Sequence, residues 1–486
     1  MKKHLPLIFS LLLAGIYSCQ SGPKQPPNII LIFADDQCYE TVHAYGNQEI
    51  ITPNLDALAR QGVTFSHAYN MGGWHGAVCV ASRTMLNTGR FLWHAQPETG
   101  DRDNIDHWRE EGKMWAQLME QAGYDTYMTG KWHVGTPAGE TFMTATDIRQ
   151  GMPEQTPEGY NRPVEGQEDL WSPYDTTFGG FWEGGTHWTK KLANTAASYI
   201  KTAAAKEKPF FMYLAFNAAH DPRQAPKEFI DMYPLENISL PLNFLQEYPY
   251  KDSMGCGPWL RDEKLAPFPR TPYAVKVNRQ EYYALVTYMD EQIGRILEAL
   301  EKSGELDNTY IFFTADHGLG NGHHGLMGKQ NMYDHSVRVP LMVCGKGIPK
   351  NKKLEMPVYL QDIMPSTLEL AGVEIPGHVE FKSLLPLIDG KKSTQYDAIY
   401  GAYMDVQRMV AEDGFKLILY PRVPVARLYN LREDPDEMND LAGDPANRIK
   451  MKELFNTLQK LQEETGDTLD LGSLFPEMGD KKQTKL

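Results

Sequence analysis

The chain has 486 residues, a length that suits one large domain with a smaller one beside it. Its hydrophobic content of 42% is that of an ordinary globular protein, and its formal net charge is -15. Because nucleic-acid-binding surfaces are strongly basic, this charge argues against a broad nucleic-acid interface, and we expect no nucleic-acid partner. A local basic pocket remains compatible with it.

Residues 1–19 resemble an export signal. Two lysines precede an apolar run over residues 5–16, which is too short to span a bilayer. Cys19 follows a small residue, as at the cleavage site of bacterial lipoproteins, and residues 20–27 are expected to form a tether. The sequence therefore predicts an exported periplasmic or outer-membrane lipoprotein, held to the membrane only by a lipid at Cys19. Ordinary signal cleavage or no processing is the alternative.

Three short apolar runs are typical of buried parallel strands, at residues 28–34, 209–216 and 309–315. Helical patterns lie between them, among them residues 108–122 and 279–301. Strands that alternate with helices indicate an α/β fold with a mostly parallel sheet.

Polar residues follow each of these strands directly. Asp35 and Asp36 follow the first, His220 the second, and Asp316 and His317 the third. In such sheets, sites form outside the carboxyl ends of the strands, so we expect these side chains to meet. Adjacent carboxylates repel one another unless a cation or proton neutralises them, and their oxygens suit Ca²⁺ or Mg²⁺.

The segment "VCVASRTMLNTGR", residues 78–90, contains a lone cysteine beside a cation. A short helix is expected over residues 81–86, with Gly89 ending it and Cys79 just before its start. The helix N-terminus and Arg83 favour an anionic group there. Three interpretations of Cys79 compete: a buried structural cysteine, a thiolate nucleophile, or the precursor of a modified residue. The other cysteines show neither a zinc spacing nor a disulfide framework.

This segment resembles the signature of the type I sulfatases, Cys-x-Pro/Ala-x-Arg followed by Thr-Gly-Arg. In that family a maturation enzyme oxidises the cysteine to the aldehyde formylglycine, so Cys79 is expected to be its precursor and the maturation enzyme a partner. Ala81 stands where proline is commoner. Six further blocks resemble family blocks in the family's order: residues 28–36, 52–70, 129–135, 313–318, 327–343 and 427–442.

The resemblance implies an alkaline-phosphatase-like α/β sandwich with a smaller C-terminal α+β subdomain on an antiparallel sheet. We expect the catalytic domain over residues 28–376 and the subdomain over 377–486. Four short strands and a helix are predicted in the latter: residues 398–403, 408–411, 415–420, 426–430 and 446–464.

The resemblance also implies a metal site. Its ligands would be Asp35, Asp36, Asp316, His317 and an oxygen on the residue derived from Cys79. Many relatives have asparagine where this chain has His317, and imidazole is a softer ligand than Ca²⁺ prefers. Ca²⁺ is the expected ion, with Mg²⁺ or Mn²⁺ as alternatives.

The catalytic roles likewise follow from matching positions. The hydrated aldehyde would offer two hydroxyls, one to attack sulfur and a second to expel sulfate. Arg83 would orient this diol, while Lys131 and Lys329 would hold sulfate oxygens. His133 resembles the base that takes the second diol proton. His220 resembles the acid for the leaving oxygen, a role it could share with Lys329.

Loops between the blocks are expected to read the substrate. Trp74 and His75 precede the nucleophile, and an aromatic ring can stack on a sugar. His187 stands just ahead of a helix expected to begin near Thr189. Loop packing without ligand contact is the alternative for each. An insertion over residues 233–277 is expected to form a wall of the cleft.

The function expected from the resemblance is hydrolysis of sulfate monoesters on carbohydrate. An exo-acting enzyme on sulfated galactose or N-acetylgalactosamine of host or algal glycans is the specific expectation. Two alternatives remain open: a phosphate or phosphonate monoester hydrolase of the same superfamily, and a non-catalytic sulfoglycan-binding lipoprotein whose Cys79 is never matured.

Overall fold

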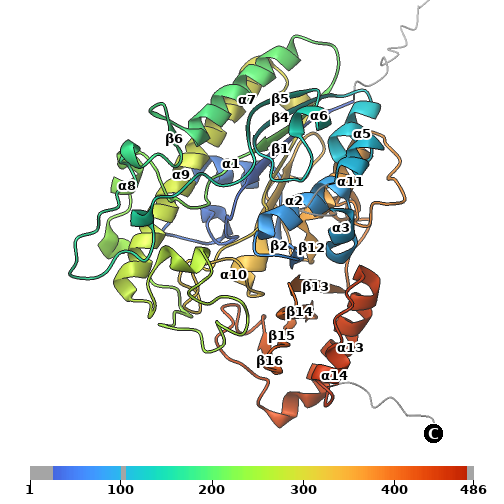
Figure 1. Ribbon diagram of the computed structural model, residues 1–486. Coiled ribbons are helices and arrows are strands. Elements are labelled where there is room, and N and C mark those ends of the chain that lie inside the picture. The colour runs from blue at the N-terminus through green and yellow to red at the C-terminus, as the bar shows by residue number, and fades with distance from the viewer. Residues whose placement is uncertain (1–25, 100–104, 479–486) are drawn as a thin grey trace, which may run out of the picture.

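Figure 1 shows the computed structural model, which describes residues 26–99 and 105–478. The expected signal peptide, Cys19 and residues 20–25 of the expected tether lie outside the described residues. Within the described part, no helix combines the length and the apolar character needed to cross a membrane.

One large mixed sheet carries the catalytic part of the chain. Its strands run in the order β11-β2-β10-β9-β1-β8-β4-β5, and β12 also pairs with β2. The central strand β1 pairs in parallel with both β8 and β9, whereas β10 runs antiparallel to its two neighbours. The mostly parallel sheet is thereby confirmed. The strand bounds are β1 Asn28–Ala34, β2 Val63–Tyr69, β4 Asp125–Lys131, β5 Thr144–Arg149, β8 Phe210–Ala215, β9 Thr309–Ala315, β10 Arg338–Cys344, β11 Lys352–Leu354 and β12 Val358–Tyr359.

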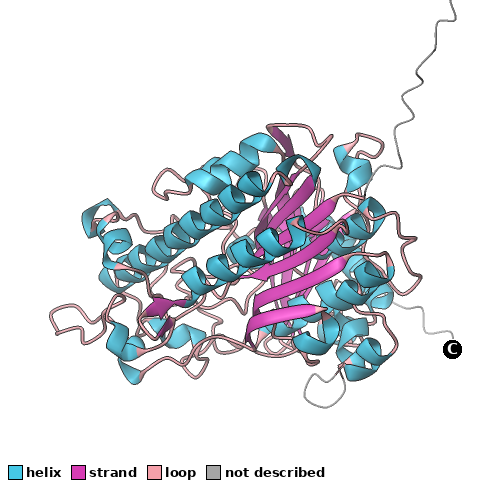
Figure 2. Cartoon of the chain, turned by 90° about the horizontal axis from the view of Figure 1, so that it is seen from above, coloured by secondary structure: helices cyan, strands magenta, loops and turns pink. Residues whose placement is uncertain are grey.

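Helices cover both faces of this sheet (Figures 1 and 2). All seven residues of β1 are buried, as its unbroken apolar sequence predicts for a strand covered on both sides. The long helix α9 includes the whole predicted segment 279–301 and packs along α7. The helices are α1 Pro53–Gln61, α2 Val78–Thr88, α3 Leu92–Glu98, α4 Asp106–Glu110, α5 Trp115–Gln121, α6 Ala138–Thr141, α7 Trp188–Ala204, α8 Lys227–Asp231, α9 Pro272–Ser303, α10 Asp334–Val337, α11 Ile363–Leu370, α12 Leu385–Ile388, α13 Arg448–Thr465 and α14 Leu471–Leu474.

The single helix expected over residues 108–122 is wrong, because the structure divides it into α4 and α5. Gly112 lies between them in the left-handed region, with φ 70°. The amide of Lys113 then donates to the carbonyl of Trp108 at 2.9 Å, which closes the end of α4. The apolar spacing continues across this break, so periodicity alone did not reveal it.

A second, smaller sheet forms near the C-terminus, in the order β16-β15-β14-β13-β3. Strands β13 Ala398–Tyr403, β14 Gln407–Glu412, β15 Phe415–Tyr420 and β16 Val425–Asn430 pair antiparallel in succession, as predicted. Helix α13 packs against β13, β14 and β15, and its bounds are close to those of the helix expected over residues 446–464. The antiparallel C-terminal sheet is therefore confirmed.

The fifth strand of this small sheet comes from far upstream. Strand β3, Gly72–Gly73, pairs in parallel with β13 through Ala402 and Tyr403. A Cβ at Gly72 would lie 1.9 Å from the carbonyl oxygen of Ala402, so only glycine allows this approach. The C-terminal sheet thus holds the chain a few residues before Cys79. The expected boundary after residue 376 stays a prediction, and α12 packs into the core of the larger sheet.

A buried ion pair fastens the end of α13 to the small sheet. Arg408 donates from Nε to Asp467 Oδ2 at 2.6 Å and from Nη2 to Oδ1 at 2.8 Å, and both side chains are 2% exposed. Tyr400 and Gln462 donate to the same carboxylate. Asp467→Asn is expected to lower the free energy of unfolding by about 3–5 kcal/mol, because Arg408 would remain buried without its counter-charge. Urea unfolding at pH 7 measures this.

The contribution of the Arg408–Asp467 pair to the free energy of unfolding depends on pH. Burial raises the pKa of Asp467, but the hydrogen bond and charge of Arg408 outweigh it and hold the pKa below its ordinary value. The stabilisation is therefore complete above the ordinary aspartate pKa and is lost as the pH falls through the lower folded-state value. The difference between wild type and Asp467→Asn should shrink accordingly in acid. Asp405→Asn is the matched control, since its exposed pair with Arg422 should contribute at most about 1 kcal/mol.

Candidate active site

Three adjacent strands end at the site. Asp35 and Asp36 follow β1, and Asp316 follows β9, so the parallel register brings them to one edge of the sheet. Single ligand atoms of these three carboxylates and of Cys79 all lie within 4.8 Å of one another. His220, after β8, reaches the same place: its Nε2 lies 3.4 Å from Asp36 Oδ2. The convergence expected from the strand ends is thus present.

Cys79 lies within the first turn of α2, not just before it as expected. The helix ends where predicted, at Gly89, whose amide donates to Met85 while φ is 73°. The thiol is 1% exposed. Burial raises the pKa of Cys79 far above its ordinary value, and Lys131 and Lys329 only partly oppose this. An unmodified Cys79 is therefore a neutral thiol in this setting, which disfavours the thiolate interpretation.

Three buried cations face the three carboxylates. Arg83 Nε donates to Asp316 Oδ2 at 2.8 Å, and Lys131 Nζ to Asp35 Oδ2 at 2.5 Å. Lys329 Nζ lies 2.7 Å from Asp36 Oδ2 and 3.1 Å from Cys79 Sγ. The formal charges of these six groups cancel. A divalent cation would make the site positive, which suits an anionic ester.

The donor set fits such a cation. Burial raises the pKa of Asp35 to about 6, and repulsion from Asp316 adds to it. Burial also raises the pKa of Asp36 to about 6, against the attraction of Lys329. Asp35 Oδ1 and His317 Nε2 are buried and have no hydrogen-bond partner among the residues that the structure describes. Carboxylates whose pKa is raised by burial, and buried acceptor atoms without a donor, are the features that a bound metal ion would account for.

Two histidines complete the site. His133 follows β4 with φ 54°, and burial, followed by the charges of Lys131 and Arg83, lowers its pKa to about 2. It is therefore unprotonated at neutral pH, the state that a proton acceptor requires. His220 is oriented by Asp221, whose Oδ1 lies 2.9 Å from His220 Nδ1. Burial first, and then Lys329, lowers the pKa of His220, while Asp221 opposes them.

These groups open into a cavity of about 390 Å³. Cys79, Lys131, His133, His220 and Lys329 line it. The sequence analysis did not name its other polar side chains, those of Arg261, Asp262 and Gln330, as site residues. The insertion over residues 233–277 does supply part of the wall, as expected. The added lining residues are Gly76, Ala77, Gly151, Met152, Leu260, Arg261, Asp262 and Gln330.

The two expected sugar-binding residues before Cys79 lie beside this cavity and not in its lining. Trp74 is 8% exposed, and its ring meets that of His75 edge-on at 6.0 Å. The next two residues, Gly76 and Ala77, do line the cavity. A role of Trp74 or His75 in substrate binding stays a prediction.

The third expected binding residue, His187, is placed elsewhere, so that expectation is wrong. His187 ends β7 (Thr186–His187) and is 1% exposed. Its Nδ1 accepts from the amide of Thr189 at 3.2 Å, capping α7, and its Nε2–H donates to the carbonyl of Gln224 at 3.0 Å. Its ring stacks on Phe181. An imidazole can cap a helix as well as bind a sugar, and the sequence does not distinguish the two.

His187→Ala is expected to lower the free energy of unfolding by about 1–3 kcal/mol, because a cap and a buried hydrogen bond are lost. The KM for substrate should not change. Denaturant unfolding and initial rates measure both. His107→Ala is the control, since that histidine is half-exposed and its loss should affect neither quantity. A large rise in KM with unchanged stability would restore the substrate-binding role of His187.

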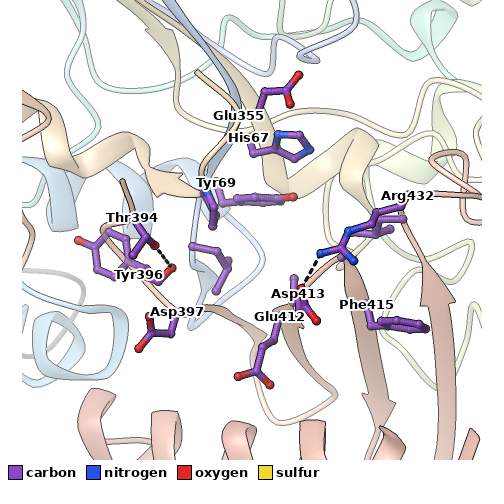
Figure 3. Close-up of a pocket in the computed structure, with 15 residues that line it drawn as sticks. His67, Tyr69, Glu355, Thr394, Tyr396, Asp397, Glu412, Asp413, Phe415 and Arg432 are labelled. Carbon is purple, nitrogen blue, oxygen red and sulfur yellow. Dashed lines mark hydrogen bonds and ion pairs between the residues drawn. The ribbon is translucent and has the colours of Figure 1, made fainter. Parts of the chain in front are cut away.

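A larger cavity of about 810 Å³ lies between β2 and the small sheet (Figure 3). Four carboxylates line it, from Glu355, Asp397, Glu412 and Asp413. Arg432 is its one arginine, and this side chain is paired with Asp413 at 2.5 Å. An acidic cavity repels an anionic ester, and none of its lining residues belongs to the site around Cys79. The smaller cavity is therefore the candidate active site.

Comparisons with known proteins show the family of the chain. The family model described as "Sulfatase" matches residues 27–373, and "N-sulphoglucosamine sulphohydrolase, C-terminal" matches residues 322–464. The chain is 26% identical to the N-acetylglucosamine-6-O-sulfatase of Bacteroides thetaiotaomicron, over 95% of this chain and 91% of the relative. It is 28% identical to an arylsulfatase of Clostridium perfringens, over 90% and 93% respectively.

Solved structures share the fold. A protein in complex with its substrate D-glucosamine-2-N,6-O-disulfate has a TM-score of 0.72 and 24% identity, over 91% of this chain and 99% of that one. The phosphonate monoester hydrolase of Agrobacterium radiobacter has a TM-score of 0.67 and 20% identity, over 90% and 96%.

The fold and the site together define a hydrolase of the alkaline-phosphatase-like superfamily. The match over most of the catalytic part is more specific. The chain belongs to the sulfatase family and is a sulfuric ester hydrolase.

Proposed function

We propose that this protein hydrolyses sulfate monoesters on carbohydrate, through a formylglycine derived from Cys79. The observation that carries the proposal is the placement of Cys79: it is buried in the first turn of α2, among three carboxylates and three cations. The N-acetylglucosamine-6-O-sulfatase among its relatives supports a sugar substrate. An exo-acting enzyme on a terminal sulfated galactose or N-acetylgalactosamine of host or algal glycans remains the specific proposal.

A divalent cation, with Ca²⁺ proposed and Mg²⁺ or Mn²⁺ as alternatives, would be held by Asp35, Asp36, Asp316, His317 and the oxygen on residue 79. When bound, it would supply positive charge to the sulfate oxygens and to the attacking oxygen. The hydrated aldehyde of residue 79 would supply one hydroxyl to attack sulfur and a second to help expel sulfate.

The remaining residues of the cavity perform binding and proton transfer. Lys131 and Lys329 line the cavity together with Cys79 and can hold sulfate oxygens, which gain charge in the transition state. His133 is neutral and can take a proton from the diol. His220, held by Asp221, can give a proton to the leaving sugar oxygen, a step that Lys329 can share.

Two further parts of the proposal concern the location and the maturation of the protein. We propose that it is exported and anchored by a lipid at Cys19, in the periplasm or at the outer membrane. A formylglycine-generating enzyme is its proposed maturation partner. Peptide mass spectrometry of protein from the native host tests both, by detecting acyl chains on Cys19 and an aldehyde at residue 79.

Sulfate release from defined sugars tests the activity. The protein is coexpressed with a maturation enzyme, and singly sulfated galactose, N-acetylgalactosamine and N-acetylglucosamine are each compared with the phosphate analogue. Release from one sulfated regioisomer, with slow or no release of phosphate, is the expected result. Faster release of phosphate would contradict the proposal. Tight binding of the sulfated sugars without release, by protein with converted Cys79, would point to a sulfoglycan-binding protein.

A phosphate or phosphonate monoester hydrolase is the second candidate function. Its structural support is the likeness to two phosphonate monoester hydrolases, with TM-scores of 0.67 and 0.68. Identities of 20% make this a likeness of fold alone. A methylphosphonate monoester in the same panel distinguishes it from the sulfatase.

A further inference from the structure

We propose that the carboxylate of Asp262 determines substrate choice, by binding a free hydroxyl on the carbon next to the sulfate ester and excluding a second sulfate there. This inference rests on the proposed function, because it assigns a role beside the same reacting group. Asp262 belongs to no block that resembles the family. It lies in the insertion over residues 233–277, at the start of a 3-10 helix, Asp262–Leu265.

The position of Asp262 relative to the nucleophile is the first argument. Its side chain lines the cavity that contains Cys79. Asp262 Oδ2 lies 4.0 Å from Lys329 Nζ, and this nitrogen lies 3.1 Å from Cys79 Sγ. If Lys329 holds a sulfate oxygen, the carboxylate of Asp262 is therefore within reach of the sugar atoms next to the ester.

The second argument is that this carboxylate is rigidly held and ionised. Arg261 Nε donates to Asp262 Oδ1 at 3.0 Å, and Gln330 Nε2 donates to Oδ2 at 2.8 Å. Burial raises the pKa of Asp262, but Arg261 and Lys329 outweigh it and lower the pKa to about 2. Each carboxylate oxygen can accept about two hydrogen bonds, so a fixed acceptor remains for a ligand hydroxyl.

The third argument is the charge around it. Arg261 also lies 3.6 Å from the carboxylate of Asp221, so one cation here faces two anions. Arg261, Asp221 and Asp262 therefore carry a net formal charge of -1, whereas the group of charges around residue 79 becomes positive once a cation binds. A second sulfate beside Asp262 would meet a like charge, while a hydroxyl would meet an acceptor.

Matched sugars test this directly. For the regioisomer that the protein accepts, three methyl glycosides are compared. The neighbouring carbon carries a free hydroxyl, a hydrogen, or a second sulfate. We expect kcat/KM to fall about 10- to 100-fold for the deoxy sugar, as for loss of a hydrogen bond to a charged group. We expect a fall of at least about 100-fold for the disulfated sugar, because like charges meet.

Two variants identify the group responsible. Asp262→Asn keeps the shape and removes the charge, so the ratio of kcat/KM for the disulfated sugar to that for the singly sulfated sugar should rise at least about tenfold. Asp252→Asn is the matched control in the same insertion. Its side chain is 57% exposed and pairs with Lys251, so the ratio should stay at the wild-type value.

The outcomes separate this inference from the proposed function. Sulfate release with equal kcat/KM on all three wild-type substrates would overturn the role of Asp262 and leave the sulfatase proposal intact. The same holds if Asp262→Asn does not change the ratio. If no ester is hydrolysed, the proposed function fails, and calorimetric Kd values decide the inference alone. Equal Kd values for the singly sulfated and disulfated sugars would then overturn it. The wild-type comparison needs no variant to fold.

Discussion

Cys79→Ala is expected to lower kcat for sulfate release at least about 10⁴-fold, because it removes the group from which the nucleophile is made. No other described side chain in the cavity replaces it, since the remaining polar groups are cations, histidines, an amide and a carboxylate held by two donors. Initial rates on the accepted sugar measure the loss. Mass spectrometry of the wild type shows whether residue 79 has been converted.

Two further variants make the result specific. Cys344→Ala is the matched control, because that buried cysteine lies at the end of β10, away from the cavity, and its thiol donates to the carbonyl of Leu58 at 3.1 Å. It should retain kcat. Cys79→Ser provides one hydroxyl where the diol would provide two. It is expected to accept sulfate once and to release it slowly. Rapid turnover by Cys79→Ala would contradict the assignment of Cys79.

Removal of divalent cations is the second large expected effect. Chelation should lower kcat/KM at least about 10³-fold, because the sulfate would lose a strong positive charge at its oxygens. It should also lower the thermal stability, since the carboxylates of Asp35, Asp36 and Asp316 would repel one another in a buried site. Readdition of Ca²⁺, Mg²⁺ or Mn²⁺ in separate samples identifies the ion.

The stability readout does not depend on turnover. A cation at about 100 times its Kd should raise the free energy of unfolding by about 2.7 kcal/mol. Asp316→Asn should abolish most of that response, because it removes one of the clustered carboxylates. Asp307→Asn is the control. Asp307 lies just before β9, outside the carboxylate cluster, so this variant should be stabilised by the cation as the wild type is. An unchanged melting temperature after chelation, in the wild type, would contradict the metal site.

The sequence predicts those parts of the fold that depend on local pattern. Continuous apolar runs identify β1 and β9 to the residue, because strands buried on both faces need no polar positions. Their parallel pairing then brings Asp35, Asp36 and Asp316 together. Where the pattern is ambiguous the prediction fails. The stop at Gly112 interrupts an apolar period. Cys79 lies inside a helix that begins at Val78, three residues before the expected start.

The rest of the site depends on contacts between distant segments. Arg261 meets His220 across 41 positions of the chain, with 3.3 Å between Nη2 and Nε2. Asp262 meets Gln330 across 68 positions. No local spacing encodes such pairs, so Asp221, Arg261 and Asp262 were absent from the predicted site. His187 is the opposite case: its place in the sequence suggested substrate binding, but the side chain is buried and caps α7.

The pairing of β3 with β13 connects the site to the order in which the chain is made. Synthesis proceeds from the N-terminus, so Gly72–Gly73 emerges long before Ala398–Tyr403, its partner in the small sheet. Until β13 has been synthesised, the segment before Cys79 lacks the strand with which it pairs in the small sheet. Once it is in place, the thiol is 1% exposed and out of reach of another enzyme. The late strand therefore limits the time in which the modification proposed for residue 79 could take place, because Cys79 is buried once β13 has paired with β3.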